Sequence, residues 1–282
     1  MVCRQSSLLF LLLPLALPVP GRGQEPLHPV QFKSNPTLTV TGAGSWRTIR
    51  KGMELRKATL ERVEPHHLIE LKMVRLDTRW VTPRIVRSQH YNLKGADVKT
   101  LAEKSGAVAA INANYFDEQG RPLGFLKVDS QEINPSVSKS SLFTGIFGIK
   151  NQLPFITHRD QFSARQADEG LQAGPLLLLR GTALSVARGA GRQSRRSLVG
   201  IDKKKRLIIA VAYSLLGGLS WAEVQEFFGA RKWQVETADL LNLDGGGSAQ
   251  IYVKSLEIEE HVPGNADVPV ALGFFEKGGR SR

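Results

Sequence analysis

The sequence predicts an α+β fold: a single domain with a mixed or antiparallel β-sheet core and a few short helices. Its 282 residues are 41% hydrophobic and 23% charged, which is typical of a globular protein with a large core. Several segments alternate apolar and polar residues with the period of a strand, and two short segments carry helical signals. Strands interleaved with few short helices indicate this class.

The first 23 residues are expected to be a secretory signal peptide. Arg4 supplies a positive charge, and residues 8–19 form an apolar run that is shorter than the roughly 20 residues needed to cross a bilayer. Cleavage near residue 23 would leave a secreted or periplasmic protein with no stable membrane anchor. The single cysteine, Cys3, would leave with the signal, so no internal disulfide is expected.

The expected strands follow in order along the chain. Residues 24–64 contain early prolines and are interpreted as an extended lead segment followed by the first strands. Residues 68–76 alternate apolar and polar side chains as a half-buried strand does. Residues 107–115 form a small-residue strand that ends in polar groups. The apolar runs at 176–179 and 207–212 have strand length, although periodicity alone also permits buried helix there.

Two helices are indicated by their spacing and caps. Residues 97–104 place apolar side chains on one face. Ser220 and Glu223 form a capping box, in which the serine accepts from free helix amides and the glutamate accepts from the serine N–H. Gly229 provides a stop for the second helix.

The charge balance favours anionic partners. Lys and Arg total 38 against 26 Asp and Glu, a net charge of +12, which suits phosphodiesters, acidic glycans or membrane headgroups. No nucleic-acid partner is expected, because Lys203–Arg206 is the one dense basic run and no reading motif accompanies it. No metal and no cofactor are expected either. The one close histidine pair, His66 and His67, would point to opposite faces of a strand.

The sharpest candidate site follows an apolar strand near the C-terminus. A strand ends in an acid, three glycines and a serine, and then a strand resumes. Successive glycines allow positive φ and close approach of a ligand, so their amides can form an anion-binding nest. The aspartate can act as acid, base or nucleophile, and the serine can donate to a phosphate oxygen. The alternative is a tight hairpin turn. The candidates are Asp244, Gly245, Gly246, Gly247 and Ser248.

A second segment, INANYFD at 111–117, carries two amides on one strand face. Asn112 and Asn114 lie opposite Ile111 and Ala113 and can bind sugar hydroxyls or phosphate. Asp117 begins the turn that follows. Ordinary turn chemistry is the simpler interpretation of Asp117, and a second catalytic carboxylate is the alternative.

A third segment combines an amide with a basic strand start. Gln172 opens the sequence QAGP, and Arg195 or Arg196 could clamp an anion, because a guanidinium fits a phosphodiester through paired hydrogen bonds. For most of the neighbouring charges, a solvated basic loop is the preferred interpretation.

These motifs together resemble the phosphodiester glycosidase family. The resemblance rests on INANYFD, QAGP, RSLVG at 196–200 and NLDGGGSAQ at 242–250, in that order, and it covers roughly residues 65–275. We therefore expect a phosphodiester glycosidase-like domain over 65–276, followed by a basic tail at 277–282. The chain departs from the family pattern at Ala266–Phe274, which lacks the arginine and asparagine that members commonly carry near a closing Pro-Val segment.

The resemblance implies an α+β domain whose strand ends gather these motifs around one pocket, and hydrolysis of a sugar-1-phosphodiester, such as an N-acetylglucosamine-1-phosphodiester. Together with the expected signal peptide, this predicts a secreted hydrolase that acts on envelope or extracellular polysaccharide. The resemblance does not decide which residue is catalytic; the mechanism that we sketch from the residues uses Asp244 as the carboxylate that activates water, with Asp117 as partner if two carboxylates are used. The resemblance also implies that the remaining motif positions line the site and bind substrate: Asn112, Asn114, Gln172, Arg196, Gly245, Gly246, Gly247 and Ser248. The alternative function is a non-catalytic module that binds an anionic polysaccharide through the same residues.

Overall fold

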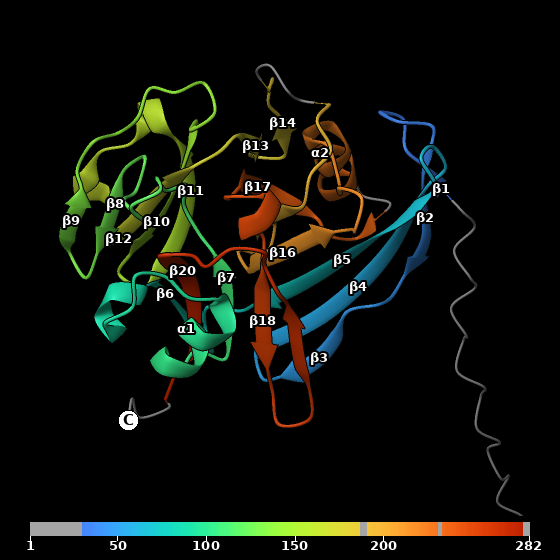
Figure 1. Cartoon of the computed structure of the whole chain (residues 1–282). Helices are drawn as coiled ribbons and strands as arrows, with labels where there is room; N and C mark the ends of the chain where they lie inside the picture. The colour runs from blue at the N-terminus through green and yellow to red at the C-terminus, as the bar shows by residue number, and fades with distance from the viewer. Residues whose placement is uncertain (1–29, 187–190, 231–232, 279–282) are drawn as a thin grey trace, which may run out of the picture.

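The computed structural model describes residues 30–186, 191–230 and 233–278, which form three antiparallel β-sheets (Figure 1). The largest sheet has the order β1-β2-β4-β5-β16-β15-β17-β13-β14, with β3 paired to β4. Its strands are β1 (Val30–Gln31), β2 (Leu38–Ala43), β3 (Arg47–Arg50), β4 (Met53–Arg62), β5 (His67–Leu76), β13 (Leu176–Leu179), β14 (Thr182–Ala183), β15 (Arg196–Asp202), β16 (Leu207–Tyr213) and β17 (Thr237–Asn242).

Two smaller sheets have five strands each. The second sheet has the order β11-β10-β12-β8-β9, and the third has the order β19-β18-β7-β20-β6. The strands of the second sheet are β8 (Leu126–Val128), β9 (Gln131–Asn134), β10 (Gly145–Lys150), β11 (Leu153–His158) and β12 (Glu169–Ala173). Those of the third sheet are β6 (Val81–Arg87), β7 (Ala109–Asn112), β18 (Ile251–Lys254), β19 (Glu259–Val262) and β20 (Val270–Glu276).

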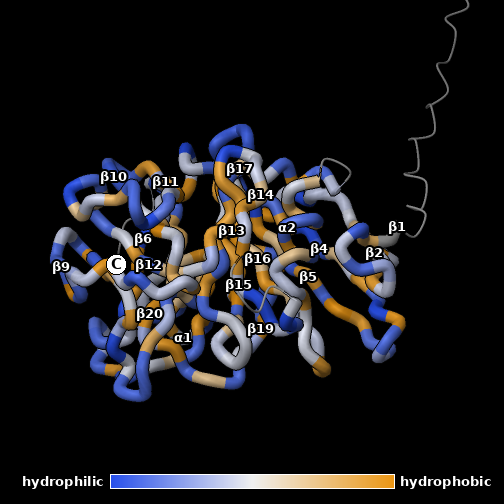
Figure 2. The backbone as a smooth tube through the Cα atoms, turned by 90° about the horizontal axis from the view of Figure 1, so that it is seen from above, coloured by the Kyte–Doolittle hydropathy of each residue, from blue (hydrophilic) through white to orange (hydrophobic). Residues whose placement is uncertain are grey.

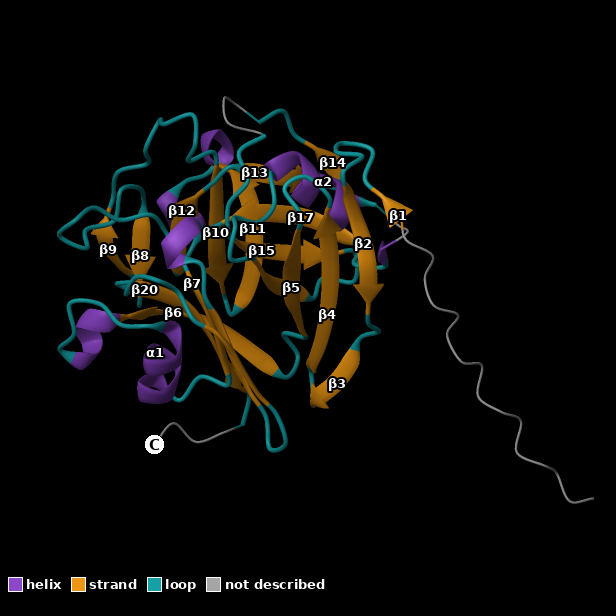
Figure 3. Cartoon of the chain, turned by 45° about the vertical axis from the view of Figure 1, so that its right-hand side comes forward, coloured by secondary structure: helices purple, strands orange, loops and turns teal. Residues whose placement is uncertain are grey.

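The expected α+β class is wrong, because the protein is β-rich. Strands hold 47% of the described residues, and helices, with 3-10 turns included, hold 13%. The described residues contain two α-helices, and Figure 3 shows that strands make up most of the fold. The expected strand at 68–76 is confirmed as β5, and the ambiguous runs at 176–179 and 207–212 are the strands β13 and β16. The class was misjudged because the strands of the second sheet are short and show little alternation. Their pairing consists of two local hairpins, β8 with β9 and β10 with β11, which β12 joins into one sheet.

The large sheet has a core on each face. Alternate residues of a strand point to opposite faces, so Val74 packs toward the two smaller sheets while Met73 packs on the other side. One core fills the space between the large sheet and the smaller sheets. Figure 2 shows that the apolar segments follow the strands in the middle of the molecule, with hydrophilic segments in the peripheral loops. The fold is therefore built from packed sheets.

The two α-helices cover sheet faces that would otherwise meet water. The first, α1 (Val98–Ser105), packs Val98 and Leu101 on the outer face of the third sheet, and Asp97 caps it by accepting from the Thr100 N–H. The second, α2 (Trp221–Gly229), packs its phenylalanines on the large sheet. Both helix predictions are confirmed, and so is the capping box of the second helix.

A buried ion pair fixes the loop that leads into α2. The Arg62 guanidinium contacts the Glu223 carboxylate at 3.0 Å, with both side chains almost fully buried. Arg62 also donates to the Gly218 carbonyl oxygen at 3.2 Å. Breaking such a pair by removing one partner typically costs about 3–5 kcal/mol, because a buried charge is left uncompensated. The loop before α2 is therefore held rigidly where it borders the motif residues.

The expected signal peptide at 1–23 lies outside the described residues, as does the tail beyond residue 278. Within the described residues, no helix is both long and apolar enough to cross a membrane. Within the described part of the lead segment, Lys33 and Ser34 are bound to α2. Glu226 accepts from the main-chain N–H groups of Lys33 and Ser34 at 2.8 Å each.

Candidate active site

Strand ends from all three sheets carry the motif residues. Asn112 ends β7 of the third sheet, and Gln172 lies near the end of β12 of the second. In the large sheet, Arg196 begins β15, and β17 ends two residues before Asp244. Antiparallel pairing joins β15 to β17, and it sets Leu198 opposite Asn242. Residues far apart in the sequence thus approach where the sheets meet.

The triple glycine forms a short 3-10 turn, and two of its glycines are required by geometry. A Cβ at Gly245 would lie 2.8 Å from the Arg195 carbonyl oxygen, and Gly246 has a φ of +57°. The N–H of Gly246 donates to that same carbonyl oxygen at 3.0 Å, and the Ser248 N–H donates to the Gly245 carbonyl oxygen at 3.1 Å. Because these two N–H groups already donate to main-chain carbonyl oxygens, they are not free to bind an anion, as the predicted nest would require.

Asp244 is half-buried at the start of this turn. Burial raises the pKa of its carboxyl to about 6, although hydrogen bonds from the Ser248 hydroxyl and the Gly245 N–H lower it. Its main-chain N–H donates to the Ala113 carbonyl oxygen at 3.0 Å, which ties the turn to the INANYFD segment. A carboxyl with this pKa is ionised at neutral pH and can still take up a proton, as a general base must.

Asn112 is fully buried and organises the backbone at the site. Its Nδ2 donates to the Asp244 carbonyl oxygen at 2.7 Å, and its Oδ1 accepts from the Ser197 hydroxyl at 2.6 Å and from the Gln250 N–H at 3.1 Å. These contacts join β7, β15 and the segment after Asp244. The side chain therefore positions Asp244, and its polar atoms are occupied.

The sequence did not single out Tyr115, which lies between the charged candidates. Its hydroxyl donates to the Gly174 carbonyl oxygen at 2.9 Å and accepts from Asn242 Nδ2 at 3.1 Å. Burial raises the Tyr115 pKa, the charge of Asp244 raises it further, and the charge of Arg196 lowers it. This tyrosine thus lies within electrostatic reach of both. Its place in the INANYFD motif was the available signal.

Arg196 is a buried cation held by main-chain acceptors. Its Nε donates to the Leu219 carbonyl oxygen at 2.8 Å, another N–H donates to the Arg192 carbonyl oxygen, and its guanidinium lies 4.9 Å from the Trp221 ring centre. Burial lowers its pKa to about 10. Within the described residues, no carboxylate lies within 4 Å of this guanidinium. A buried positive charge without such a partner favours an anionic ligand.

Two further amide candidates have different surroundings. Asn114 is buried, and its Nδ2 donates to the Tyr115 carbonyl oxygen, while its Oδ1 has no hydrogen-bond partner among the described residues. Gln172 is fully engaged with the loop that contains Ser138 and Phe143. Its Nε2 donates to the carbonyl oxygens of these two residues at 2.8 Å each, and its Oε1 accepts from the Ser138 N–H at 2.7 Å. Gln172 therefore supports a loop rather than facing a ligand.

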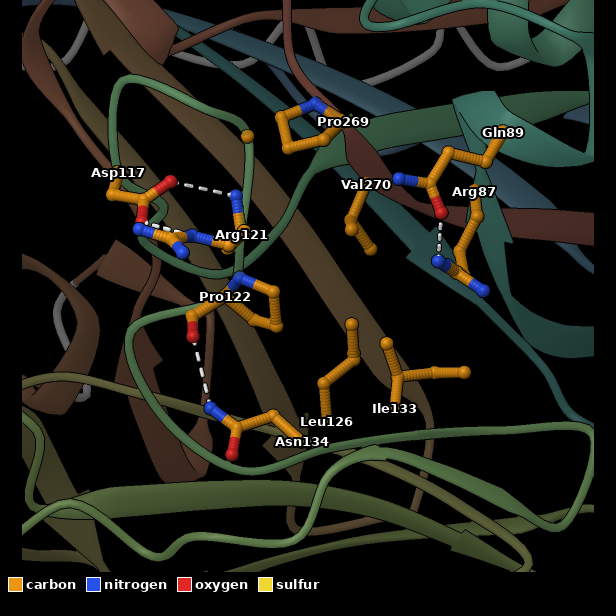
Figure 4. A pocket seen from close by; sticks show the side chains of 11 residues that line it. Arg87, Gln89, Asp117, Arg121, Pro122, Leu126, Ile133, Asn134, Pro269 and Val270 are labelled. Carbon is orange, nitrogen blue, oxygen red and sulfur yellow. Dashed lines mark hydrogen bonds and ion pairs between the residues drawn. The ribbon is translucent and has the colours of Figure 1, made fainter.

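Asp117 lies in the turn at the end of the INANYFD segment, and it lines a cavity that does not include Asp244 or Arg196 among its lining residues (Figure 4). Its carboxylate accepts from the Arg121 guanidinium at 2.7 Å and from the Gln119 and Arg121 main-chain N–H groups. These hydrogen bonds lower its pKa. The contacts are those of ordinary turn chemistry, which was one of the two interpretations of this residue.

The segment that departs from the family pattern borders the glycine turn. The Asn265 and Ala266 N–H groups both donate to the Gly247 carbonyl oxygen, at 2.7 and 3.2 Å. Further along, the Val270 carbonyl oxygen accepts from the Ala113 N–H at 3.2 Å. The sequence difference at 266–274 therefore lies against the candidate site.

Known structures with this fold come from animals and bacteria. The catalytic domain of zebrafish N-acetylglucosamine-1-phosphodiester alpha-N-acetylglucosaminidase, auto-inhibited by its pro-peptide, matches with a TM-score of 0.63 and 18% identity, over 86% of this chain and 89% of that one. A hypothetical protein from Synechocystis matches with a TM-score of 0.57 and 15% identity, over 84% and 65% of the two chains. A putative exported protein from Burkholderia pseudomallei matches with a TM-score of 0.51 and 10% identity, over 78% and 74%. These likenesses show the fold.

A search of the curated proteins gave no significant match. The family model for phosphodiester glycosidase matches residues 105–275. This match spans more than half of the chain and includes every candidate residue described above. The resemblance noted in the motifs is thereby confirmed, and the chain belongs to the phosphodiester glycosidase family.

Proposed function

We propose that this protein is a secreted hydrolase that cleaves the glycosidic bond of a sugar-1-phosphodiester in envelope or extracellular polysaccharide. Membership of the family supports a glycosidase-type function. The observation that carries the proposal is the pairing of chemistries at the site. Asp244 is a half-buried carboxyl with a raised pKa, and Arg196 is a buried guanidinium without a carboxylate partner among the described residues.

The proposed reaction is a single displacement by water. The Asp244 carboxylate accepts a proton as water attacks the anomeric carbon, the bond between that carbon and the phosphate oxygen breaks, and the phosphate monoester leaves with the bonding electron pair. The products are the free sugar and a phosphomonoester. Because a phosphate monoester is a stable anion, its departure needs no proton from a second carboxyl. The proposed mechanism therefore needs one carboxylate, Asp244.

Positive charge at the phosphate is the second requirement. The N–H groups of Arg196 that are not bound to Leu219 or Arg192 can donate to the phosphate oxygens and stabilise the charge that grows on them. The Trp221 ring and the two main-chain acceptors hold the guanidinium in place, which reduces the reorganisation needed during the reaction.

Secretion is part of the same proposal. Its support is the sequence pattern at residues 1–23, with Arg4 ahead of an apolar run. An enzyme exported from the cytoplasm would meet envelope or extracellular polysaccharide. Fractionation of cells that express the full chain tests secretion directly. Retention of residues 1–23 on the purified protein, read by N-terminal sequencing, would contradict it.

A panel of sugar-1-phosphodiesters, including N-acetylglucosamine-1-phosphodiesters, tests the activity. Wild-type protein is expected to release free sugar and phosphomonoester in equal amounts, and Asp244→Asn is expected to release neither. Asp239→Asn is the matched control, because Asp239 lies on the same strand β17 and accepts from the Arg180 N–H, away from the turn. Thermal melting establishes that all three proteins are folded.

The products separate the alternatives. Release of a sugar phosphate rather than free sugar would place the cut on the other side of the phosphorus and overturn the glycosidase assignment. Binding of the diesters without turnover by folded wild-type protein would favour the non-catalytic module. Equal loss in the Asp239→Asn control would show that the Asp244 effect is not specific to the site.

A further inference from the structure

A cavity of about 380 Å³ lies at the seam between the second and third sheets (Figure 4). It is bordered by β6 and the start of β20 on one side and by β8 and β9 on the other. Both β6 and β9 are edge strands of their sheets, so the cavity opens where two edges diverge. Its volume is within the roughly 300–1,000 Å³ that is usual for ligand pockets.

Of the two arginines that line this cavity, one has a carboxylate partner and the other has none among the described residues. Arg121 is neutralised by Asp117 through a 2.7 Å ion pair. Arg87 is half-buried and donates to the Gln89 side-chain oxygen, but no carboxylate lies within 4 Å of it in the described part of the chain. Burial lowers the Arg87 pKa, and the group nevertheless stays charged at neutral pH. Arg87 is therefore the uncompensated positive charge of the cavity.

Apolar side chains lie between the two polar ends. Figure 4 shows Leu126, Ile133 and Val270 between the Asp117 and Arg121 pair at one end and Gln89 with Arg87 at the other. Apolar surface suits the C–H face of a sugar ring, and a guanidinium suits a carboxylate. We propose that this cavity binds an acidic sugar unit, with its carboxylate on Arg87 and its ring against Ile133.

The cavity is linked to the candidate active site by two main-chain hydrogen bonds. The Val270 carbonyl oxygen accepts from the Ala113 N–H, and the Ala113 carbonyl oxygen accepts from the Asp244 N–H. The backbone that holds Asp244 and the backbone that lines the cavity are thus coupled through Ala113. The assignment of a sugar as ligand rests on the proposed function, whereas the preference for an anion rests on Arg87 alone.

An adjoining hollow of about 740 Å³ shares Gln89, Gly120 and Pro269 with the cavity. Its lining contains one lysine and two acids, Lys94, Glu118 and Asp267, so it does not compete with Arg87 for an anion. Two connected hollows favour an oligosaccharide over a single sugar. The expected ligand is thus a glycan with uronate units, and its neutral units can extend into the second hollow.

The test is calorimetric binding of trigalacturonate to the wild-type protein, with the neutral trisaccharide galactotriose as the comparison ligand. Arg87→Gln is expected to weaken trigalacturonate binding at least about tenfold, as loss of a charge-assisted hydrogen bond does. Arg84→Gln is the matched control. Arg84 lies on the same strand, but its alternation points it to the other face, over the Phe275 ring. This control should stay within about twofold of wild type.

A second variant fills the cavity without changing its charge. Ile133→Phe is expected to weaken both trisaccharides, whereas Arg87→Gln should leave galactotriose unaffected. No trigalacturonate binding by wild type, or equal weakening by Arg84→Gln and Arg87→Gln, would overturn the proposal. Competition by inorganic phosphate at equal concentration would assign Arg87 to phosphate and overturn the uronate ligand.

The outcome is separable from that of the proposed hydrolysis. Trigalacturonate affinity is expected to survive in Asp244→Asn, which lacks turnover. Binding with no hydrolysis of any diester by wild type would contradict the proposed function and leave the cavity assignment standing. Hydrolysis of a diester by wild type without trigalacturonate binding would support the proposed function and overturn the cavity assignment.

Discussion

The turns that hold Asp244 and Asp117 contain the same kind of side chain in opposite environments. Asp244 is half-buried, and burial raises its pKa to about 6. Asp117 is bound by the Arg121 guanidinium and by two main-chain N–H groups, which lower its pKa. Ionising the Asp244 carboxyl costs free energy, so its carboxylate is the better base. The Asp117 carboxylate is stabilised as an anion and is therefore a poor base.

The difference follows from where the chain places each turn. Asp244 follows β17 in the large sheet, where residues of all three sheets meet, and its side chain is half-buried there. Asp117 lies in a short turn that returns toward the second sheet, and its partners are residues two and four positions away. Long-range packing therefore sets the chemistry of Asp244, and local sequence sets that of Asp117.

The largest expected effect is on turnover. Asp244→Asn should lower kcat on a small sugar-1-phosphodiester by about 10²–10⁴-fold, the usual contribution of a general base. Asp117→Asn should leave kcat within about twofold, because its carboxylate serves a turn. Steady-state kinetics of the two variants measure this directly. Comparable losses in both would indicate a paired-carboxylate mechanism and break the contrast.

The two turns should also affect stability in opposite directions. The folded pKa of Asp244 exceeds its unfolded value of about 3.9. Its ionisation therefore costs stability, and the cost grows as pH rises from about 4 to about 6 and is constant above. Asp244→Asn should accordingly raise the free energy of unfolding at pH 8 by roughly 2–3 kcal/mol, with little change at pH 4.

Asp117 has the opposite sign, because its folded pKa is lowered. It contributes stability above its unfolded pKa, and that contribution disappears as pH falls through the folded pKa. Asp117→Asn should therefore destabilise the protein at pH 8 and not at strongly acidic pH. Urea unfolding of both variants at pH 8 checks the signs, and repeating it at pH 4 for Asp244→Asn and at strongly acidic pH for Asp117→Asn checks the pH dependence. The same sign for both would contradict the burial argument.

A smaller effect is expected on the pH dependence of the reaction. The Ser248 hydroxyl donates to the Asp244 carboxylate and lowers its pKa, so Ser248→Ala should move the acidic limb of the pH profile of kcat to higher pH. One such hydrogen bond contributes about 0.5–1.5 kcal/mol. Arg121→Gln should raise the Asp117 pKa without moving this limb. A limb that responds to Arg121→Gln would show that Asp117 titrates in the reaction.

Local sequence patterns predicted the elements whose determinants are local. The helix at 97–104 and the capping box at Ser220 are confirmed, because spacing and caps lie within a few residues of each other. The β-rich class was missed. Strands such as β8, with three residues, are defined by pairing with β12 and β9 and carry no readable period.

The candidate site shows the same division. The sequence motifs pointed to Asp244 and the glycine turn. A glycine is needed at position 245 because the Arg195 carbonyl oxygen lies too close to allow a Cβ there. The motifs did not reveal that Tyr115 lies within electrostatic reach of Arg196 and Asp244, because those residues come from separate sheets. The motifs also did not show that the Gln172 side chain is hydrogen-bonded to a loop, since its partners Ser138 and Phe143 are about thirty residues earlier.

Arg195 and Arg196 are consecutive residues, but their side chains contact different parts of the protein. Arg195 donates to the Ala249 and Pro263 carbonyl oxygens at 2.9 and 2.5 Å, and its own carbonyl oxygen holds Gly246. Arg196 points to Tyr115 and Trp221 instead. A single inserted or deleted residue here would send each guanidinium to the other side of the chain. Natural length variation should therefore be absent between Ser194 and Ser197, even where neighbouring loops grow and shrink among relatives.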